Sequence, residues 1–276
     1  MEIKLIAVDL DGTLVNSKRQ VTERTMQTLK AAAAQGVHIV PTTGRLFHAI
    51  PKELQTCSFI RYGICMNGGQ IYDAKEDQIL HRDEIPLDLA MRVYDYLEQF
   101  PVVYDCYMNN GAYMERESWE RLDQIIIDRP LDLAYSRNLR KPVEDFRGYL
   151  QNVGMSLQKM QAFMADANIR PAIMEGLQER FPELAVSYSL PFNIEINSAT
   201  AIKGNALKIL CDLLGIPIGQ AAAFGDGTND ISMLQAAGVG VAMGNAAPEA
   251  KAAANYETAT NDEDGVAQFI EQYVLK

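Results

Sequence analysis

The sequence predicts an α/β protein, a doubly wound parallel sheet with a smaller α+β domain inserted into it. Ile3–Leu10 is a continuous apolar run, typical of a strand that is buried on both faces of a parallel sheet. Strand-like and helical patterns alternate at both ends of the chain, as in βαβ units. A different pattern fills the middle. We therefore expect residues 1–82 and 193–276 to form an α/β core domain, and residues 83–192 to form an inserted α+β domain.

Apolar runs and capping residues place the elements of the core domain. Thr22 can cap a helix over Thr22–Gln35, and Gly36 can end it. Before the insertion we also expect strands over Val37–Pro41, Ile64–Met66 and Gln70–Tyr72 and a helix over Leu46–Leu54. After it we expect helices over Ala206–Leu214, Asp230–Ala237, Pro248–Ala254 and Glu263–Val274, and strands over Ala221–Phe224 and Val239–Ala242.

The insertion has its own helices and short strands. The expected helices are Leu87–Phe100, Trp119–Asp128 and Arg170–Phe181, and the expected strands are Val102–Cys106, Ala112–Glu115, Leu157–Met164, Leu184–Ser189 and Asn193–Asn197. A loop rich in Arg, Asn and Pro is expected between the second helix and the strand at Leu157. Trp119 can stack on an aromatic leaving group, although packing is the commoner use of such residues. The basic run Arg137–Lys141 can steer anions or lie in a solvated loop.

Composition excludes several classes of protein. The 276 residues carry a net charge of −11, which argues against nucleic acid as a partner because phosphate backbones select basic surfaces. The four cysteines have no CxxC spacing, so neither a disulfide framework nor a zinc site is expected, and a reducing cytoplasm is the simpler location. No stretch is long and apolar enough for a membrane span, and the N-terminus is a buried strand and not a signal peptide.

The most informative motif is Asp9-Leu10-Asp11-Gly12-Thr13, directly after a buried strand. In open α/β sheets, ligands bind beyond the carboxyl ends of the strands. Residues two apart in an extended segment point the same way, so we expect Asp9 and Asp11 to converge on one site. Gly12 allows a sharp turn there. A solvated turn at the end of a strand is the plainer alternative.

A second acidic motif follows another apolar strand. Gly225-Asp226-Gly227-Thr228-Asn229-Asp230 comes directly after Ala221–Phe224 and gathers carboxylate and amide oxygens within a few positions. Such oxygen donors suit Mg²⁺, which proteins usually hold with one or two carboxylates. The alternative is a capped helix start.

Two further segments can hold an anion. Thr42-Thr43-Gly44-Arg45 follows a strand and offers a hydroxyl and backbone N–H groups at a helix start. Lys203 lies at the start of a helix, where its charge opposes the helix dipole, so another partner is expected to hold it there. Taken singly, a capped loop and a solvated lysine explain these residues equally well.

Together, the four segments resemble the motifs of the haloacid dehalogenase-like hydrolases in order, strand context and spacing. Asp9-Leu-Asp-Gly-Thr resembles the first motif, Thr43 the second, Lys203 the third, and the run from Asp226 to Asp230 the fourth. The insertion resembles the α/β cap of the Cof-type subfamily, which contains many phosphatases of sugar phosphates and related metabolites. The resemblance covers nearly the whole chain and implies a Rossmann-like core with an inserted cap that sets substrate specificity.

The resemblance implies a Mg²⁺-dependent phosphatase acting through an aspartyl-phosphate. Asp9 would attack phosphorus, and Asp11 would protonate the leaving group and then activate water. Thr43, with the backbone N–H groups of Leu10 and Gly44, would hold the phosphoryl oxygens, and Lys203 would offset their charge. The expected metal ligands are Asp9, Asp11 through its backbone carbonyl, Asp226 and Asp230; Asn229 belongs to the same motif and would contact substrate.

Other polar residues after strands are weaker candidates. Asn67 and Gly68 lie in a loop that the resemblance places near the mouth of the site, although an Asn-Gly hairpin turn is at least as good an explanation. Asn245 can contact phosphate or Asp230, or simply begin a helix. Arg45 can be a surface residue that pairs with a core carboxylate. The isolated residues His38, His48 and His81 are expected to be structural.

Two other functions stay open at this stage. A phosphosugar mutase would share the aspartyl-phosphate but needs cations in the inserted domain to grip a second phosphate, and the run Arg137–Lys141 is the only hint of them. A non-catalytic regulatory protein could retain the metal and phosphate pocket. The expected partner is a small phosphorylated metabolite; sugar phosphates, pyridoxal phosphate and flavin mononucleotide are not distinguished, and the sequence does not give the oligomeric state.

Overall fold

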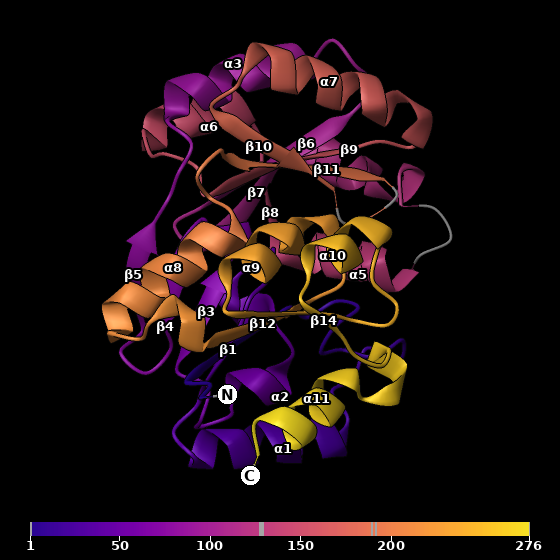
Figure 1. Ribbon diagram of the computed structural model, residues 1–276. Coiled ribbons are helices and arrows are strands. Elements are labelled where there is room, and N and C mark those ends of the chain that lie inside the picture. The colour runs from indigo at the N-terminus through magenta and orange to yellow at the C-terminus, as the bar shows by residue number, and fades with distance from the viewer. Residues whose placement is uncertain (1, 127–129, 189, 191, 276) are drawn as a thin grey trace. The chain divides into compact units, whose positions relative to one another are not determined.

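The computed structural model describes residues 2–126, 130–188, 190 and 192–275 (Figure 1). These residues divide into two compact units, Met1–Arg82 with Ala201–Lys276 (unit 1) and Asp83–Thr200 (unit 2). The sequence predicted that the chain returns to the core domain at residue 193, whereas it enters unit 1 again at Ala201. The reason is that strand β11 (Asn193–Ser198) pairs on both sides with strands of unit 2.

Unit 1 is built on a five-stranded parallel sheet with the order β14-β13-β12-β1-β2. Its strands are β1 (Leu5–Val8), β2 (His38–Pro41), β12 (Ala221–Gly225), β13 (Val239–Ala242) and β14 (Tyr256–Glu257). All four residues of β1, which lies between β12 and β2, are completely buried, as expected for a strand covered on both faces.

Helices cover both faces of this sheet (Figure 1). On one face lie α8 (Lys203–Leu214), α9 (Ile231–Ala236) and α10 (Pro248–Ala253), and on the other lie α1 (Glu23–Ala34) and α11 (Gly265–Tyr273). Thr22 caps α1 as expected, since its side chain accepts a hydrogen bond from the backbone N–H of Thr25. The predicted doubly wound core is therefore confirmed.

Two expectations for the segment before the insertion are wrong. The helix over Leu46–Leu54 is instead a 3₁₀ turn (Phe47–Ala49) and a short helix α2 (Lys52–Gln55). Pro51 separates the two because proline lacks the N–H of a helix interior and forces the residue before it into an extended conformation.

The strands after α2 also leave the parallel sheet. Strands β3 (Tyr62–Cys65), β4 (Gln70–Asp73) and β5 (Gln78–Arg82) form a separate antiparallel sheet, in which β4 is central. A single parallel bridge, from Thr42 to Ile64, links this sheet to the end of β2.

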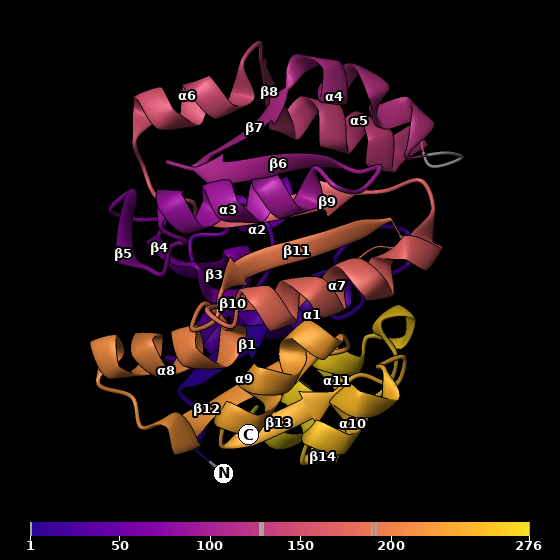
Figure 2. The ribbon, with the colours of Figure 1, turned by 90° about the horizontal axis from the view of Figure 1, so that it is seen from above.

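Unit 2 contains a six-stranded sheet with the order β10-β11-β9-β6-β7-β8. Besides β11, its strands are β6 (Val103–Met108), β7 (Gly111–Glu115), β8 (Arg140–Val143), β9 (Lys159–Phe163) and β10 (Leu184–Ser187). Neighbours are antiparallel except β7 and β8. Helices α3 (Leu87–Leu97), α6 (Phe146–Val153) and α7 (Arg170–Arg180) pack on one face (Figure 1 and Figure 2).

The expected loop before Leu157 contains regular structure, namely α5 (Pro130–Leu139), β8 and α6. Asp145 caps α6 and Gly154 ends it in the left-handed conformation, two signals that the composition of the loop obscured. The expected helix over Trp119–Asp128 is a short helix α4 (Arg116–Glu120) followed by a 3₁₀ turn (Arg121–Gln124). Asp128 and Ser189, the expected ends of two elements, lie outside the described residues.

The other face of the unit 2 sheet carries a buried row of polar side chains. Asp105, Gln161 and Glu195 are cross-strand neighbours on β6, β9 and β11. Arg140 pairs with Asp105 at 2.5 Å, and Lys159 pairs with Glu195 at 2.9 Å. The basic run Arg137–Lys141 therefore lies at the end of α5 and the start of β8 and not in a loop, with the Arg140 guanidinium buried and Lys141 exposed.

Within the described part of the chain, no helix combines the length and apolar character that crossing a membrane requires.

Replacing Leu29 by Ala tests the packing of α1. Leu29 is completely buried, so Leu29→Ala should lower the free energy of unfolding, measured in urea, by about 3 kcal/mol through lost burial and the cavity left behind. Leu213 in α8 is 55% exposed and provides the matched control, for which the same substitution should cost less than about 0.5 kcal/mol. Equal losses at the two positions would contradict the packing described.

Candidate active site

The parallel sheet of unit 1 brings the predicted motifs to one edge. Val8, the last residue of β1, pairs with Phe224 on β12 and with Pro41 on β2. Asp9 therefore lies beside the start of the Asp226 loop on one side and beside Thr42 on the other. Two backbone hydrogen bonds keep the chain segments aligned beyond the ends of the strands. Asp9 N donates to Phe224 O (3.0 Å), and Thr42 N donates to Val8 O (2.8 Å).

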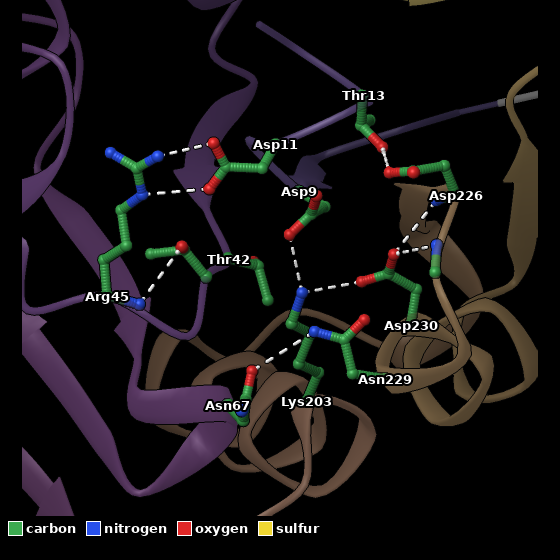
Figure 3. Close-up of polar contacts among 12 residues, drawn as sticks. Asp9, Asp11, Thr13, Thr42, Arg45, Asn67, Lys203, Asp226, Asn229 and Asp230 are labelled. Carbon is green, nitrogen blue, oxygen red and sulfur yellow. Dashed lines mark hydrogen bonds and ion pairs between the residues drawn. The ribbon is translucent and has the colours of Figure 1, made fainter. Parts of the chain in front are cut away.

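Lys203 lies completely buried at the first turn of α8. Its ammonium donates hydrogen bonds to Asp9 Oδ1 and to Asp230 Oδ1, both at 2.6 Å (Figure 3). These two carboxylates are the partners expected for a lysine that opposes the helix dipole. The contact joins three segments that are far apart in the sequence.

Three carboxylates meet around this lysine. Asp9, Asp226 and Asp230 each offer an oxygen, and these atoms lie within 4.8 Å of one another. Asp226 Oδ1 accepts a hydrogen bond from the hydroxyl of Thr13 at 2.7 Å. Asp230 Oδ2 accepts from the backbone N–H groups of Asp226 and Gly227, both at 2.9 Å, so the loop after β12 is folded around this side chain.

The charges in this group do not balance. Burial raises the pKa of the Asp9 carboxyl well above its usual value, and Asp230 and Asp226 add to this rise while Lys203 opposes it. Burial, with further contributions from Asp230 and Asp11, raises the pKa of Asp226 to about 6 despite the Thr13 hydrogen bond. Burial alone would lower the pKa of Lys203, but Asp230 and Asp9 hold it above its usual value.

A divalent cation fits this arrangement. Three carboxylates share a single ammonium, so the charged side chains of the group carry an excess of negative charge; burial first, and the neighbouring carboxylates second, raise the pKa values of Asp9 and Asp226. The donor atoms are all oxygens, as Mg²⁺ prefers. Asp9, Asp226 and Asp230 are the side chains that could hold such an ion.

Asp11 does not join the carboxylate group, contrary to the expectation that it converges with Asp9. Strand β1 ends at Val8, so the alternation of an extended strand does not apply to these two residues. The chain turns at Gly12, which has a φ of +90° and no room for a Cβ beside Asp226. The exposed Asp11 carboxylate points instead toward Arg45 and forms two hydrogen bonds with it (Figure 3).

The loop after β2 presents the other expected anion-binding groups. Thr43 is buried, and its hydroxyl accepts a hydrogen bond from the backbone N–H of Arg45 at 3.2 Å. Gly44 lies between them and is partly exposed. The Leu10 side chain is completely buried in the core, so only its backbone can meet a ligand.

The asparagines serve mainly to tie loops together. Asn67 adopts a left-handed conformation, and its Oδ1 accepts from Asn229 Nδ2 at 3.3 Å. Gly68 has a φ of +112° and lies so close to Ile202 that a Cβ would come within 2.6 Å of that residue's backbone. Asn245 Nδ2 donates to Gly12 O at 2.8 Å and therefore supports the turn after Asp11, and its Oδ1 accepts from the backbone N–H of Asn261 at 3.0 Å.

Sequence reasoning missed one member of the site. The hydroxyl of Thr13 orients Asp226, although the sequence assigned Thr13 no role of its own. Its place in the first motif, next to a glycine turn, was a usable signal. Arg45 was expected to pair with a core carboxylate, and the structure identifies that carboxylate as Asp11.

Comparison with known proteins agrees with this geometry. A family model described as haloacid dehalogenase-like hydrolase matches residues 6–270. Phosphatase YwpJ of Bacillus subtilis (strain 168) is 33% identical over 287 residues, covering 97% of this chain and 99% of the relative. The 5-amino-6-(5-phospho-D-ribitylamino)uracil phosphatase YcsE of the same organism is 30% identical over 279 residues, covering 100% of this chain and 97% of the relative.

A solved structure adds the subclass. The HAD subclass IIB sugar phosphatase BT4131 superimposes with a TM-score of 0.84 at 26% identity, covering 99% of this chain and 100% of the other. The family match extends over most of the sequence, and the relatives align over almost their full length. The chain therefore belongs to the haloacid dehalogenase-like hydrolases, in the Cof-type branch of phosphatases.

Proposed function

We propose that this enzyme is a Mg²⁺-dependent phosphatase that hydrolyses phosphate monoesters of small metabolites, with Asp9 as nucleophile. The observation that carries the proposal is the position of Asp9, whose carboxylate lies 2.6 Å from a buried ammonium and within a group of three carboxylates. The proposed nucleophile Asp9, the cation Lys203 and the carboxylate oxygens that could bind a metal therefore lie together in unit 1.

The need for cations follows from the charges of the reactants. Two like unit charges 4 Å apart repel by about 4 kcal/mol at an effective dielectric constant of 20. A carboxylate attacking a phosphate dianion meets this repulsion, which corresponds to about three decades in rate. Lys203 offsets part of it with a full charge that is already fixed next to Asp9.

Magnesium would be held by the side chains of Asp9 and Asp226 and the backbone carbonyl of Asp11, with Asp230 beside them, and when bound it would supply further positive charge to the phosphoryl group.

The chain's own residues then account for a two-step reaction. Asp9 attacks phosphorus, an aspartyl-phosphate forms, and the bond from phosphorus to the ester oxygen breaks. Asp11 gives its proton to that oxygen as the alcohol leaves. Water next attacks the aspartyl-phosphate and passes a proton to Asp11, which releases inorganic phosphate and restores Asp9. Thr43 and the backbone N–H groups of Leu10 and Gly44 would hold the phosphoryl oxygens during both steps.

The substrate class is proposed from relatives of known name. One of them acts on a phosphorylated ribitylaminouracil and another is named a sugar phosphatase, so a small phosphorylated metabolite is the class that we propose here. The mutase alternative is weakened, because Arg140, one of the three cations of the basic run, is buried against Asp105.

Replacing Asp9 by Asn tests the nucleophile. Asp9→Asn keeps the shape of the side chain but removes its charge, so kcat/KM for p-nitrophenyl phosphate should fall by at least about a thousandfold. Asp212, exposed on α8, provides the control, since Asp212→Asn should retain full activity. Circular dichroism should show both variants folded. Normal turnover by folded Asp9→Asn enzyme would refute the proposed mechanism.

The dependence on Mg²⁺ and pH tests the carboxylate group. Activity should disappear with EDTA and return with Mg²⁺. Because the pKa of Asp226 is about 6 without metal, its carboxyl is protonated below that pH and must lose the proton to bind the ion. The Mg²⁺ concentration for half-maximal activity should therefore rise by at least about tenfold for each pH unit below 6, because Asp9, whose pKa burial also raises, must lose its proton as well. A half-activating concentration that is equal at pH 5 and pH 7 would contradict this role for Asp226.

A further inference from the structure

Asp11 and Arg45 form a bidentate ion pair, in which two N–H groups of the guanidinium, called here the fork of Arg45, donate to the two carboxylate oxygens. Arg45 Nη2 lies 2.5 Å from Asp11 Oδ1, and Arg45 Nε lies 2.9 Å from Asp11 Oδ2. Both carboxylate oxygens therefore accept from the same edge of the guanidinium. Figure 3 shows this carboxylate turned toward Arg45 and away from Asp226 and Asp230.

The arginine is anchored independently of this pair. Its Nη1 donates to Ala49 O at 3.3 Å, its backbone N–H donates to Thr43 Oγ1 at 3.2 Å, and its carbonyl accepts from Met66 N at 3.2 Å. The guanidinium thus presents a fixed edge next to the loop proposed to hold phosphoryl oxygens. The Asp11 side chain, which is 60% exposed, is the freer partner.

This geometry conflicts with the chemistry proposed for Asp11. Bidentate pairing requires both oxygens to accept hydrogen bonds, whereas the acid in the first step must use one oxygen to donate a proton. Asp11 must therefore leave Arg45 before it can serve a leaving group. Its departure exposes an arginine edge that suits phosphate as well as carboxylate.

We infer that Arg45 is a positioning residue that changes its hydrogen-bond partner during the reaction. Its fork binds the Asp11 carboxylate before substrate arrives and binds a phosphoryl oxygen afterwards. Asp11 is then released toward the reacting atoms when phosphate is bound. This inference rests on the proposed function, because it assumes that phosphate binds at the Thr43 loop and that Asp11 is the acid and base. It adds a role for Arg45 in coupling the arrival of phosphate to the orientation of Asp11.

The test measures competition between Asp11 and phosphate for Arg45. Four proteins are compared, the wild type, Asp11→Asn, Arg45→Met and the double variant, and calorimetry gives the Kd of inorganic phosphate with Mg²⁺ present. The neutral amide competes more weakly for the guanidinium than a carboxylate does. Asp11→Asn should therefore tighten phosphate binding about tenfold when Arg45 is present and less than about threefold in the Arg45→Met background.

The alternatives give different results. If Asp11 acts on phosphate only by charge repulsion, its replacement will have the same fold effect in both backgrounds, which would overturn the inference and leave the proposed function intact. Failure of all four proteins to bind phosphate would overturn the proposed function and the inference with it. Weaker binding by Asp11→Asn in the presence of Arg45 would also overturn the exchange.

Two further variants separate the fork from simple charge or folding effects. Arg45→Lys keeps the charge without the bidentate edge, so the effect of Asp11→Asn in that background should fall below that in the wild type. An effect as large as in the wild type would overturn the role of the fork. Arg24 forms a similar two-bond pair with Glu271, between α1 and α11. Arg24→Met should leave the Kd of phosphate unchanged, and a change equal to that of Arg45→Met would count against a specific role for Arg45.

Discussion

The site depends on one buried ammonium. Lys203 takes its charge out of water, which costs several kcal/mol, and hydrogen bonds to Asp9 and Asp230 offset this cost. Loss of either carboxylate would leave a buried charge poorly compensated. The three residues come from segments before and after the insertion, so the site is complete only when both parts of unit 1 have folded onto one sheet.

Much of this arrangement could be predicted from local patterns. The apolar runs before Asp9 and Asp226 each predict a buried strand of a parallel sheet, whose strands end at the same edge, and the structure makes these two strands neighbours. Lys203 could be singled out because a lysine at a helix start needs a partner. These predictions rest on the hydrophobicity of short runs and on single charges, which a sequence expresses over a few residues.

The orientation of Asp11 could not be predicted in the same way, whereas the pairing of β3 with β4 agrees with the Asn-Gly hairpin turn that the sequence offered as one of two explanations. Where β1 stops decides whether Asp11 lies beside Asp9, and it stops at Val8, before the alternation of a strand would align the two. Strand β3 has the apolar residues of a core strand but pairs with β4, because the tight turn at Asn67 and Gly68 brings the following strand back beside it. Both outcomes depend on backbone turns and on contacts between distant residues.

The close approach of Gly68 to Ile202 has a consequence for how the molecule can vary. Ile202 directly precedes Lys203, so the hairpin of β3 and β4 and the helix that carries the lysine lie backbone against backbone at this point. At Gly68 the two backbones are too close for even a Cβ atom between them. A shift of the hairpin is therefore transmitted directly to the lysine. Substitutions in the small antiparallel sheet can thus move the ammonium relative to Asp9 without altering any residue of the site.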